Sequence, residues 1–336
     1  MCSQAEPPNA GGNPFFSIII LCWNSDRFLA DCLSALSFQT EKDFEVLVLD
    51  NGSRQPVSPT KDDNIKTLDI HWLRSEENLG FAAGNNYAGK SARGEYLALL
   101  NADAFPAPDW LEQVRRGIEK YPDCFFASRL IMADHPDRYD GIGDVYHASG
   151  LAWRNAYNSP VLEKESDHEV FSACAAAAIY PRAAFDKVDG FDEAFFAYIE
   201  DVDLGFRLRL AGYRCIYLSR ATVKHVGSAS TGLKSEFSVY YGLRNSVWAF
   251  VKDMPGFWVW LLAPAHILAN LLQIFMGVIH HRGRVTLRAK VDAVKGLPKV
   301  IKKRKAVQAS RIAAIPAVLK AMDWNPFSPV IKWLQR

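Results

Sequence analysis

The chain has 336 residues, of which 49% are hydrophobic and 23% are charged, and its formal net charge is +2. This composition is ordinary for a folded globular protein and excludes a chain that is disordered over most of its length. The six cysteines are scattered without CxxC spacing, which favours free thiols in a reducing compartment over a disulfide framework.

The first elements alternate between apolar runs and helical patterns. Residues 1–13 lack the charged and apolar regions of a signal peptide, so we expect a short disordered lead-in there. The run Phe16–Cys22 predicts a strand, about Asp26–Ser37 predicts a helix, and Glu45–Asp50 predicts a second strand.

The same alternation continues through the next sixty residues. Strands are predicted at Ile70–Leu73 and Tyr96–Leu100, with helices from about Ala82 and after Pro108. Continuous apolar strands separated by helices favour an α/β fold with a doubly wound, mostly parallel sheet covered on both faces.

Polar side chains follow three of these strands, where such sheets bind their ligands. They are Asn24, Asp50, Asn101 and Asp103. Asp103 could ligate Mg²⁺ or Mn²⁺, which prefer carboxylate oxygens, although an Asx-turn would explain it equally simply. The chain has neither G-x-G-x-x-G after the first strand nor GxxxxGK[ST], which counts against a Rossmann dehydrogenase and a P-loop NTPase.

A glycine-bearing loop, NLGFAAGNN, spans residues 78–86 and enters a helix. Its backbone N–H groups would favour an anion such as a diphosphate. The alternative is a close packing contact made by the glycines.

Two adjacent carboxylates, Glu200 and Asp201, follow the aromatic run FFAY and begin a helix that closes at Gly212. Neighbouring carboxylates in a partly apolar setting repel each other, so one can have a raised pKa and act as a general base. The alternative is a solvated first turn stabilised by the helix dipole. Asp203 and Arg207 are four residues apart, which predicts an ion pair along the helix.

His225 follows an apolar strand and precedes small residues. A neutral imidazole near Asp103 could complete a metal shell with substrate phosphate oxygens, whereas a lone histidine is more often structural.

Seven features of the chain, taken together and in order, resemble glycosyltransferase family 2. They are the first strand with Asn24, VLVLDNGS, NLGFAAGNN, LNADA, GFDEAFFAYIEDVDLGFRLRLAGY, the histidine and YYGLRN. Members of this family are inverting nucleotide-sugar transferases with the GT-A fold. The resemblance covers about residues 16–245 and is greatest to the bacterial rhamnosyltransferase-type branch, which builds surface polysaccharides.

The resemblance implies that the donor is a nucleoside-diphosphate sugar. Asp50 would bind its base or ribose, with Asn24 in the same pocket. The sugar nucleotide would also contact Asn78, Gly80, Phe81 and Asn85.

The resemblance further implies a metal site and a base. Asp103 would be the metal-binding carboxylate of a D-x-D motif whose first position is Asn101 here, and His225 would be a further ligand. Glu200 or Asp201 would be the base, with Glu200 favoured because it follows the aromatic run directly. The base would deprotonate an acceptor hydroxyl that attacks the anomeric carbon in one inverting displacement, assisted by Mg²⁺ or Mn²⁺.

The C-terminal region, residues 251–336, is predicted to be helical and membrane-associating, next to a catalytic domain at 14–250. Phe257–Ile279 is long enough to span a bilayer but contains several polar residues. Residues 282–311 hold eleven Lys or Arg and one Asp, a net +10, so the remainder is near −8. Sugar nucleotides are found in the cytosol, so the catalytic domain should lie there. A single spanning helix would then place the basic segment on the opposite side of the membrane, against the positive-inside rule. We therefore expect an interfacial or re-entrant helical pair broken near Pro264, on anionic lipid at the cytoplasmic face of the inner membrane.

Two other functions are compatible with parts of the sequence. A membrane-bound scaffold without activity would explain Asn101, but not the retention of the other acidic residues and His225. A sugar nucleotidyltransferase would be expected to carry a glycine- and arginine-rich loop after the first strand, where this chain has CWNSDRF. The basic segment resembles no nucleic-acid-reading module, so we expect a glycan or lipid-linked glycan acceptor and no nucleic acid.

Overall fold

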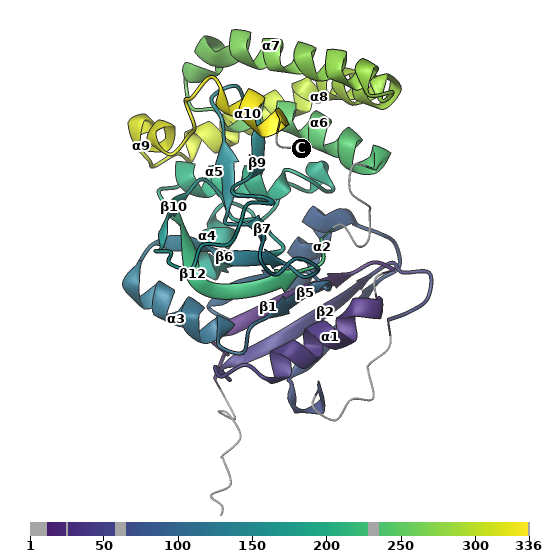
Figure 1. Ribbon diagram of the computed structural model, residues 1–336, viewed down its shortest axis with the longest axis vertical. Coiled ribbons are helices and arrows are strands. Elements are labelled where there is room, and N and C mark those ends of the chain that lie inside the picture. The colour runs from purple at the N-terminus through teal and green to yellow at the C-terminus, as the bar shows by residue number, and fades with distance from the viewer. Residues whose placement is uncertain (1–11, 25, 58–64, 228–234, 335–336) are drawn as a thin grey trace, which may run out of the picture.

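The computed structural model describes residues 12–24, 26–57, 65–227 and 235–334. An α/β body carries the first two thirds of the chain, and a layer of helices from the last third covers one end of it (Figure 1). Eleven of the 13 lead-in residues lie outside the described residues.

The N-terminal half of the large sheet is parallel, as predicted. Its neighbouring strands run in the order β4-β1-β2-β3. The side chains of β1 and β2 are almost entirely buried, which is why these strands are continuous apolar runs rather than alternating ones. The bounds are β1 Phe16–Cys22, β2 Phe44–Asn51, β3 Ile70–Ser75 and β4 Tyr96–Leu100.

The other half of the sheet is mixed. Strand β11 (Ala177–Pro181) lies antiparallel between β4 and β6 (Cys124–Met132), and β12 (Arg214–His225) runs parallel to β6. The remaining short strands of this sheet are β5 Ala104–Pro106, β7 Tyr139–Gly141 and β10 His168–Val170. Strands β8 Asp144–Tyr146 and β9 Ala152–Arg154 form a separate hairpin. The predicted α/β class with a parallel core is confirmed, and the antiparallel pairings of this sheet among the described residues occur in its second half.

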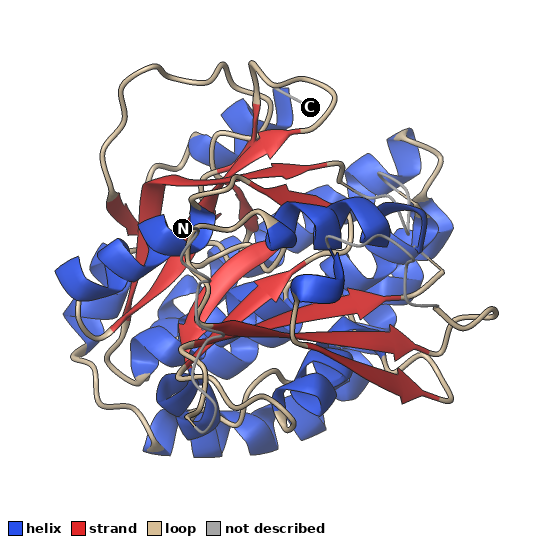
Figure 2. Ribbon diagram, turned by 90° about the horizontal axis from the view of Figure 1, so that it is seen from below, coloured by secondary structure: helices blue, strands red, loops and turns tan. Residues whose placement is uncertain are grey.

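Helices cover both faces of the sheet (Figure 2). One core cluster packs α1 and α3 against one face, and a second packs α2, α4 and α5 against the other. The predicted closure of α5 is correct, since Gly212 follows it with φ +100°, a conformation that favours glycine. The bounds are α1 Asp26–Ser37, α2 Gly80–Gly89, α3 Trp110–Lys120, α4 Arg182–Lys187 and α5 Glu200–Leu210, with short 3₁₀ turns at Ile65–Thr67 and Glu193–Phe195.

The C-terminal helices form a third core with α5. The predicted Asp203–Arg207 ion pair is present, at 2.7 Å, and the fully buried Asp203 also pairs with Lys252 of α6. The bounds are α6 Glu236–Asp253, α7 Trp258–Ile279, α8 Gly283–Ala309, α9 Ile315–Lys320 and α10 Ser328–Leu334.

The expected break near Pro264 is wrong. Helix α7 continues through Pro264, which lies in its second turn, and the chain reverses only at residues 280–282 before α8. A proline removes one intrahelical hydrogen bond, and the flanking apolar turns tolerate that loss here. Helix α7 is the one helix in the described part of the chain that is long and apolar enough to cross a membrane.

Candidate active site

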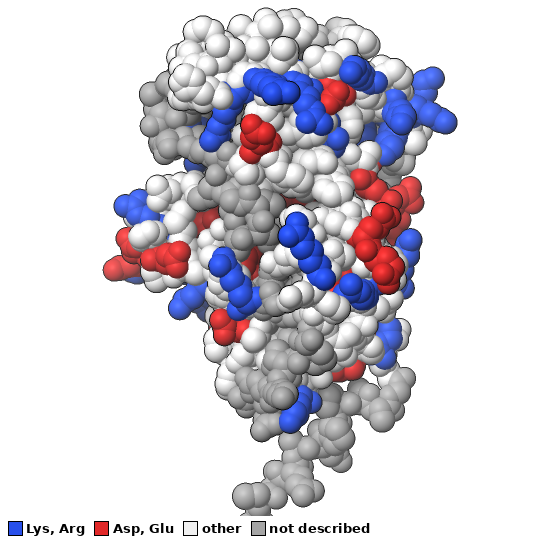
Figure 3. Space-filling model, turned by 90° about the vertical axis from the view of Figure 1, so that its right-hand side faces the viewer, with Lys and Arg blue, Asp and Glu red and all other residues white. Residues whose placement is uncertain are grey.

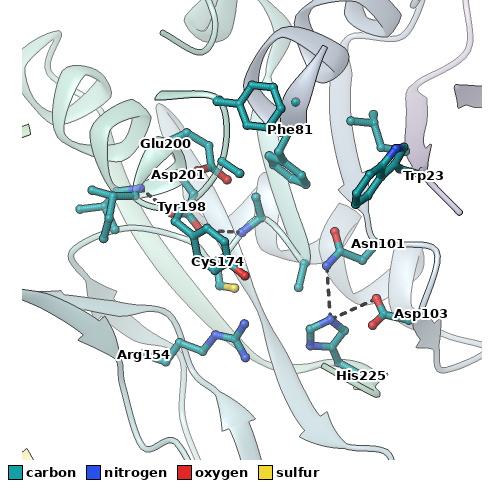
Figure 4. A pocket seen from close by; sticks show the side chains of 18 of the residues that line it. Trp23, Phe81, Asn101, Asp103, Arg154, Cys174, Tyr198, Glu200, Asp201 and His225 are labelled. Carbon is teal, nitrogen blue, oxygen red and sulfur yellow. Dashed lines mark hydrogen bonds and ion pairs between the residues drawn. The ribbon is translucent and has the colours of Figure 1, made fainter. Parts of the chain in front are cut away.

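A cavity of about 390 Å³ opens at the carboxyl ends of β1 and β4 and beneath the start of α5. It brings together residues that are more than 120 positions apart in sequence, among them Asn101, Asp103, Glu200, Asp201 and His225 (Figure 4). The predicted metal and base residues therefore share one cavity, which neither an isolated Asx-turn nor a solvated helix start would require.

The metal end of the cavity is defined by Asn101, Asp103 and His225. The turn between β4 and β5 carries the first two, and β5 pairs with β12 so that His225 lies opposite Ala104. His225 Nε2 is 3.3 Å from Asp103 Oδ1 and 3.3 Å from Asn101 Nδ2. Strand pairing thus places the histidine beside Asp103.

The other ring nitrogen of His225 is oriented by a second carboxylate. Nδ1 lies 2.7 Å from Asp140 Oδ2, and Arg154 donates to both oxygens of Asp140 at 2.6 and 2.7 Å. Burial opposes a charged imidazole, but hydrogen bonds to Asp103 and Asp140 outweigh it and raise the pKa of His225. A histidine whose Nδ1–H is held by a carboxylate directs the Nε2 lone pair outward, as metal-ligating histidines do.

This donor set fits a divalent cation. Asp103 supplies a hard oxygen and His225 an imidazole nitrogen, and the cavity leaves space for oxygens of a substrate. In the described residues a second acidic group, Glu45, Asp69 and His71, also has metal-ligand spacing. It is a poorer candidate, because Arg93 donates to both of its carboxylates.

The base end consists of Glu200 and Asp201 at the start of α5. Glu200 is 6% exposed, and its Oε2 has no hydrogen-bond partner among the described residues. Asp201 is half-buried, and its carboxylate accepts from the backbone N–H groups of Ala175 and Val202 at 3.2 and 2.8 Å. The two carboxylates are adjacent in sequence but lie in different environments.

Electrostatics separates the pair further. Burial, followed by the charge of Asp201, raises the pKa of Glu200 well above its usual range. Burial also raises the pKa of Asp201, although its two amide hydrogen bonds and Arg154 oppose the rise. A third carboxyl, Asp144, has its pKa raised well above its usual range by burial and then by the charge of Asp201. Such a difference lets one carboxyl stay neutral while its neighbour is ionised.

The glycine-bearing loop at residues 78–86 differs from what the sequence predicts. Asn78, Gly80 and Phe81 line the cavity. The amides of α2 expected to bind an anion are already used, since Phe81 N and Ala82 N donate to Phe196 O at 2.6 and 3.1 Å. The expected diphosphate site on this loop stays a prediction, and in this structure the N–H groups of Phe81 and Ala82 are occupied by Phe196 O.

Three predicted nucleotide contacts lie outside the cavity lining. Asp50 is 4% exposed and accepts from Arg74 and from the amides of Ser53 and Val57, which together lower its pKa against the effect of burial. Asn24 and Asn85 bond to backbone groups, at 3.1 and 2.9 Å. The roles of these three residues stay predictions.

Several lining residues were not predicted from the sequence. Asn51 and Trp23 each adjoin a predicted residue at a strand end, and this proximity could have revealed them. Asp144 and Arg154 come from the β8–β9 hairpin, whose short strands have no periodic signature, and Tyr198 precedes the acidic pair. Figure 4 shows the Arg154 guanidinium directed into the space between Cys174 and His225.

The α/β fold with this cavity at the strand ends is that of a glycosyltransferase of the GT-A type. The model of the family described as "Glycosyl transferase family 2" matches residues 17–189, half of the chain. The protein belongs to this family and is a glycosyltransferase.

Relatives and solved structures agree with this assignment. The chain is 26% identical over 267 residues to the N-acetylglucosaminyl-diphospho-decaprenol L-rhamnosyltransferase of Mycobacterium tuberculosis, covering 72% of this chain and 85% of that protein. It is similar in fold to S. aureus TarS 1-349 in complex with UDP-GlcNAc (18% identity, TM-score 0.55, 91% of this chain and 90% of that one). It is also similar to the mannosyltransferase PcManGT from Pyrobaculum calidifontis in complex with GDP-Man and Mn²⁺ (16% identity, TM-score 0.51, 94% and 88%).

Proposed function

We propose that the protein transfers a sugar from a nucleoside-diphosphate donor to a hydroxyl of a lipid-linked surface glycan, with inversion at the anomeric carbon. The observation that carries this proposal is the single cavity with Asp103 and His225 at one end and Glu200 and Asp201 at the other. A leaving diphosphate and an attacking hydroxyl need opposite ends of such a cavity.

Asp201 is the better candidate for the base, in contrast to the preference for Glu200 that the sequence suggests. Asp201 is half-buried where Glu200 is buried, and its carboxylate is oriented by two backbone amides. Burial raises the pKa of Glu200 well above its usual range, so Glu200 would be the carboxyl that holds a proton and Asp201 the one that carries the negative charge. Asp201 would take the proton from the acceptor hydroxyl as the new glycosidic bond forms and the bond to the diphosphate breaks.

Asp103 and His225 would hold Mg²⁺ or Mn²⁺, which would neutralise the charge that develops on the departing diphosphate. Asp140 and Arg154 would keep the imidazole in place. Asn78, Gly80 and Phe81 would contact the sugar nucleotide from the opposite wall.

The relative from Mycobacterium tuberculosis supports rhamnose as the sugar and a polyprenyl-diphosphate-linked acceptor. A donor screen tests this: purified protein, Mn²⁺ or Mg²⁺ and a panel of nucleotide sugars, followed by release of nucleoside diphosphate. We expect turnover with one donor that is lost in both Asp103→Ala and Asp201→Asn. Silence across the panel, with no thermal shift by any nucleoside diphosphate, would instead favour a scaffold without activity.

Helix α7 supports a location on the membrane surface. Its outward face is apolar and exposed, including Trp260 (73%), Phe275 (61%) and Val278 (62%). Its polar side chains face the protein: His266 Nδ1 lies 2.8 Å from Ser149 O, and Gln273 accepts from Lys290 of α8 at 2.7 Å. A spanning helix would leave Lys290 without this partner, so we propose that α7 lies in the plane of the interface.

Basic residues surround this apolar face. Figure 3 shows an uncharged cap at the end that carries α7, with Lys and Arg gathered just below it. The exposed basic side chains of α8, the helix that packs against α7, include Arg284, Arg288, Lys295, Lys299 and Lys302. An apolar ridge beside a basic belt matches anionic lipid at the cytoplasmic face of the inner membrane.

Flotation with vesicles tests this location. We expect binding to phosphatidylglycerol-containing vesicles, weaker binding to neutral ones, and loss of binding in the double variant Trp260→Ser/Phe275→Ser. Phe38→Ser, which removes an equally exposed aromatic residue from the opposite end of the molecule, is the matched control. Alkaline extraction should release the protein from native membranes, whereas retention would indicate a spanning helix.

A further inference from the structure

The segment that leads into α5 has an unusual backbone. Phe196, Tyr198 and Ile199 have φ values of +65°, +67° and +67°, and none of them is glycine. Left-handed conformations are sterically unfavourable for L-residues, most of all for β-branched ones such as Ile199. Such a segment keeps its shape only if the surrounding structure holds it.

One side chain of α6 contacts this segment along its length. Asn245 is fully buried, and its Nδ2 donates to the carbonyls of Phe195, Ala197 and Tyr198 at 2.9, 2.9 and 2.7 Å. An amide nitrogen has two hydrogens, so the three carbonyls share them. The reverse orientation of the amide would place its oxygen against three carbonyl oxygens, so the donor role is fixed.

The neighbouring residue holds Asn245 in this orientation. Arg244 Nε donates to Asn245 Oδ1 at 2.9 Å, and its Nη2 donates to the carbonyls of Ala194 and Phe195 at 2.9 and 3.0 Å. Its guanidinium also lies 4.1 Å from the centre of the Trp248 ring. Two consecutive residues of α6 therefore satisfy most of the carbonyls of residues 194–198.

The held segment touches both sides of the cavity. Phe196 O accepts hydrogen bonds from the amides of Phe81 and Ala82 at the start of α2, and the segment ends at Ile199, directly before the acidic pair. A shift of this segment would move Glu200 and Asp201 relative to the glycine-bearing loop at residues 78–86. A misplacement of catalytic groups by about 1 Å can lower a rate by about 10²-fold.

We infer that Asn245 is a positioning residue: it holds residues 195–198 in their strained conformation and thereby places the acidic pair against the donor site. The inference rests on the proposed role of that pair in proton transfer. It also makes the helical layer a part of the active site, because the residue belongs to α6 rather than to the α/β body.

Hydrogen exchange of the protein without substrate tests the holding role. The amides of Ala197 and Asp203 are hydrogen-bonded to Phe195 O and Ile199 O. We expect Asn245→Ala to speed exchange in peptides covering residues 195–203 while the sheet stays protected. Ser246→Ala is the matched control, because the hydroxyl of this buried neighbour donates to Leu243 O within its own helix and bonds to no other group in the described part of the chain. Unchanged exchange at 195–203 in Asn245→Ala overturns the inference.

Steady-state kinetics then tests positioning. We expect Asn245→Ala to lower kcat about 10- to 100-fold with little change in donor KM, and Ser246→Ala to resemble wild type. Asn245→Ser, which keeps one donor, should be intermediate. Ile199→Gly relaxes the left-handed strain and should restore part of the kcat lost in Asn245→Ala.

The outcomes separate the two proposals. Faster exchange at 195–203 without a fall in kcat overturns the positioning role. A wild-type protein that releases no nucleoside diphosphate from any donor overturns the proposed function, and the exchange data still decide whether Asn245 holds the segment. If Asn245→Ala fails to fold, Asn245→Ser supplies the same comparison.

Discussion

The two ends of the cavity are built in different ways. The proposed metal end comes from the β4–β5 turn and from β7, β9 and β12, and its side chains form a chain of polar contacts from Asp103 through His225 and Asp140 to Arg154. The proposed base end follows a strained segment, burial raises the pKa of both its carboxyls, and Glu200 Oε2 has no hydrogen-bond partner among the described residues. The comparison teaches that side chains proposed to bind a cation are held by hydrogen bonds to one another, whereas side chains proposed to move a proton lie where burial raises their pKa.

The largest effect should come from the base end. Asp201→Asn should lower kcat by about 10²–10⁴-fold, the usual contribution of a positioned base, while the donor still raises Tm. Glu200→Gln should cost less, because the raised pKa of Glu200 favours its neutral form, which glutamine resembles. The measurement is kcat for both variants with the preferred donor, and a greater loss in Glu200→Gln would reverse the assignment.

Removing the metal ligand should have a different signature at the other end. Asp103→Asn should weaken Mn²⁺ activation, so that activity returns only at much higher Mn²⁺. The Tm shift produced by nucleoside diphosphate with Mn²⁺ should also shrink. Activity titrated against Mn²⁺ measures this, with Asp69→Asn as control for the Arg93-paired acidic group. An unaltered Mn²⁺ response in Asp103→Asn would show that the ion binds elsewhere.

A smaller effect is expected at Asp140, which contacts the proposed metal ligand His225. Asp140→Asn keeps the shape but weakens the hold on His225 Nδ1, and such changes typically cost about 10–100-fold in metal affinity. The Mn²⁺ concentration for half-maximal activity should rise while kcat at saturation stays close to wild type. A fall in saturated kcat alone would assign Asp140 to another role.

The smallest effect concerns stability. The pKa of Glu200 is higher in the folded protein than in the unfolded chain, so folding favours the neutral form, and stability falls as pH rises above the unfolded value near 4.5. Glu200→Gln removes this loss. At pH 7–8 its free energy of unfolding should exceed that of wild type by about 1.4 kcal/mol per unit of pKa shift, and its Tm should be correspondingly higher.

The advantage of Glu200→Gln should disappear below about pH 4.5, where the carboxyl is neutral in both states. Thermal unfolding across this range measures it. A constant Tm difference at every pH would attribute the gain to packing rather than to charge.

The sequence predicted the parallel half of the sheet almost residue for residue, because buried strands are continuous apolar runs. It also predicted Asp103, His225 and the acidic pair, which occupy ordered motifs. Asp140, Asp144 and Arg154 were missed, because they come from short strands whose pairing is decided by tertiary contacts. The preference for Glu200 over Asp201 rested on chain order, which carries no information about exposure.

The C-terminal region shows another limit of sequence patterns. Hydropathy identified α7, but the inward orientation of His266 and Gln273 depends on partners in other elements. Pro264 indicated a break that the structure does not have. Part of the predicted basic tail is also used internally, since Lys303 pairs with Asp192.

Arg304 gives the helical layer a practical consequence for protein engineering. Its guanidinium donates to the carbonyls of Val251 and Met254 at the end of α6 and to Gly256 beyond it. A shortened version of the protein, cut before α8 to improve solubility, would leave these carbonyls unsatisfied and loosen the helix that carries Asn245. Detergent or surface substitutions on α7 are therefore the better route to a soluble, active enzyme.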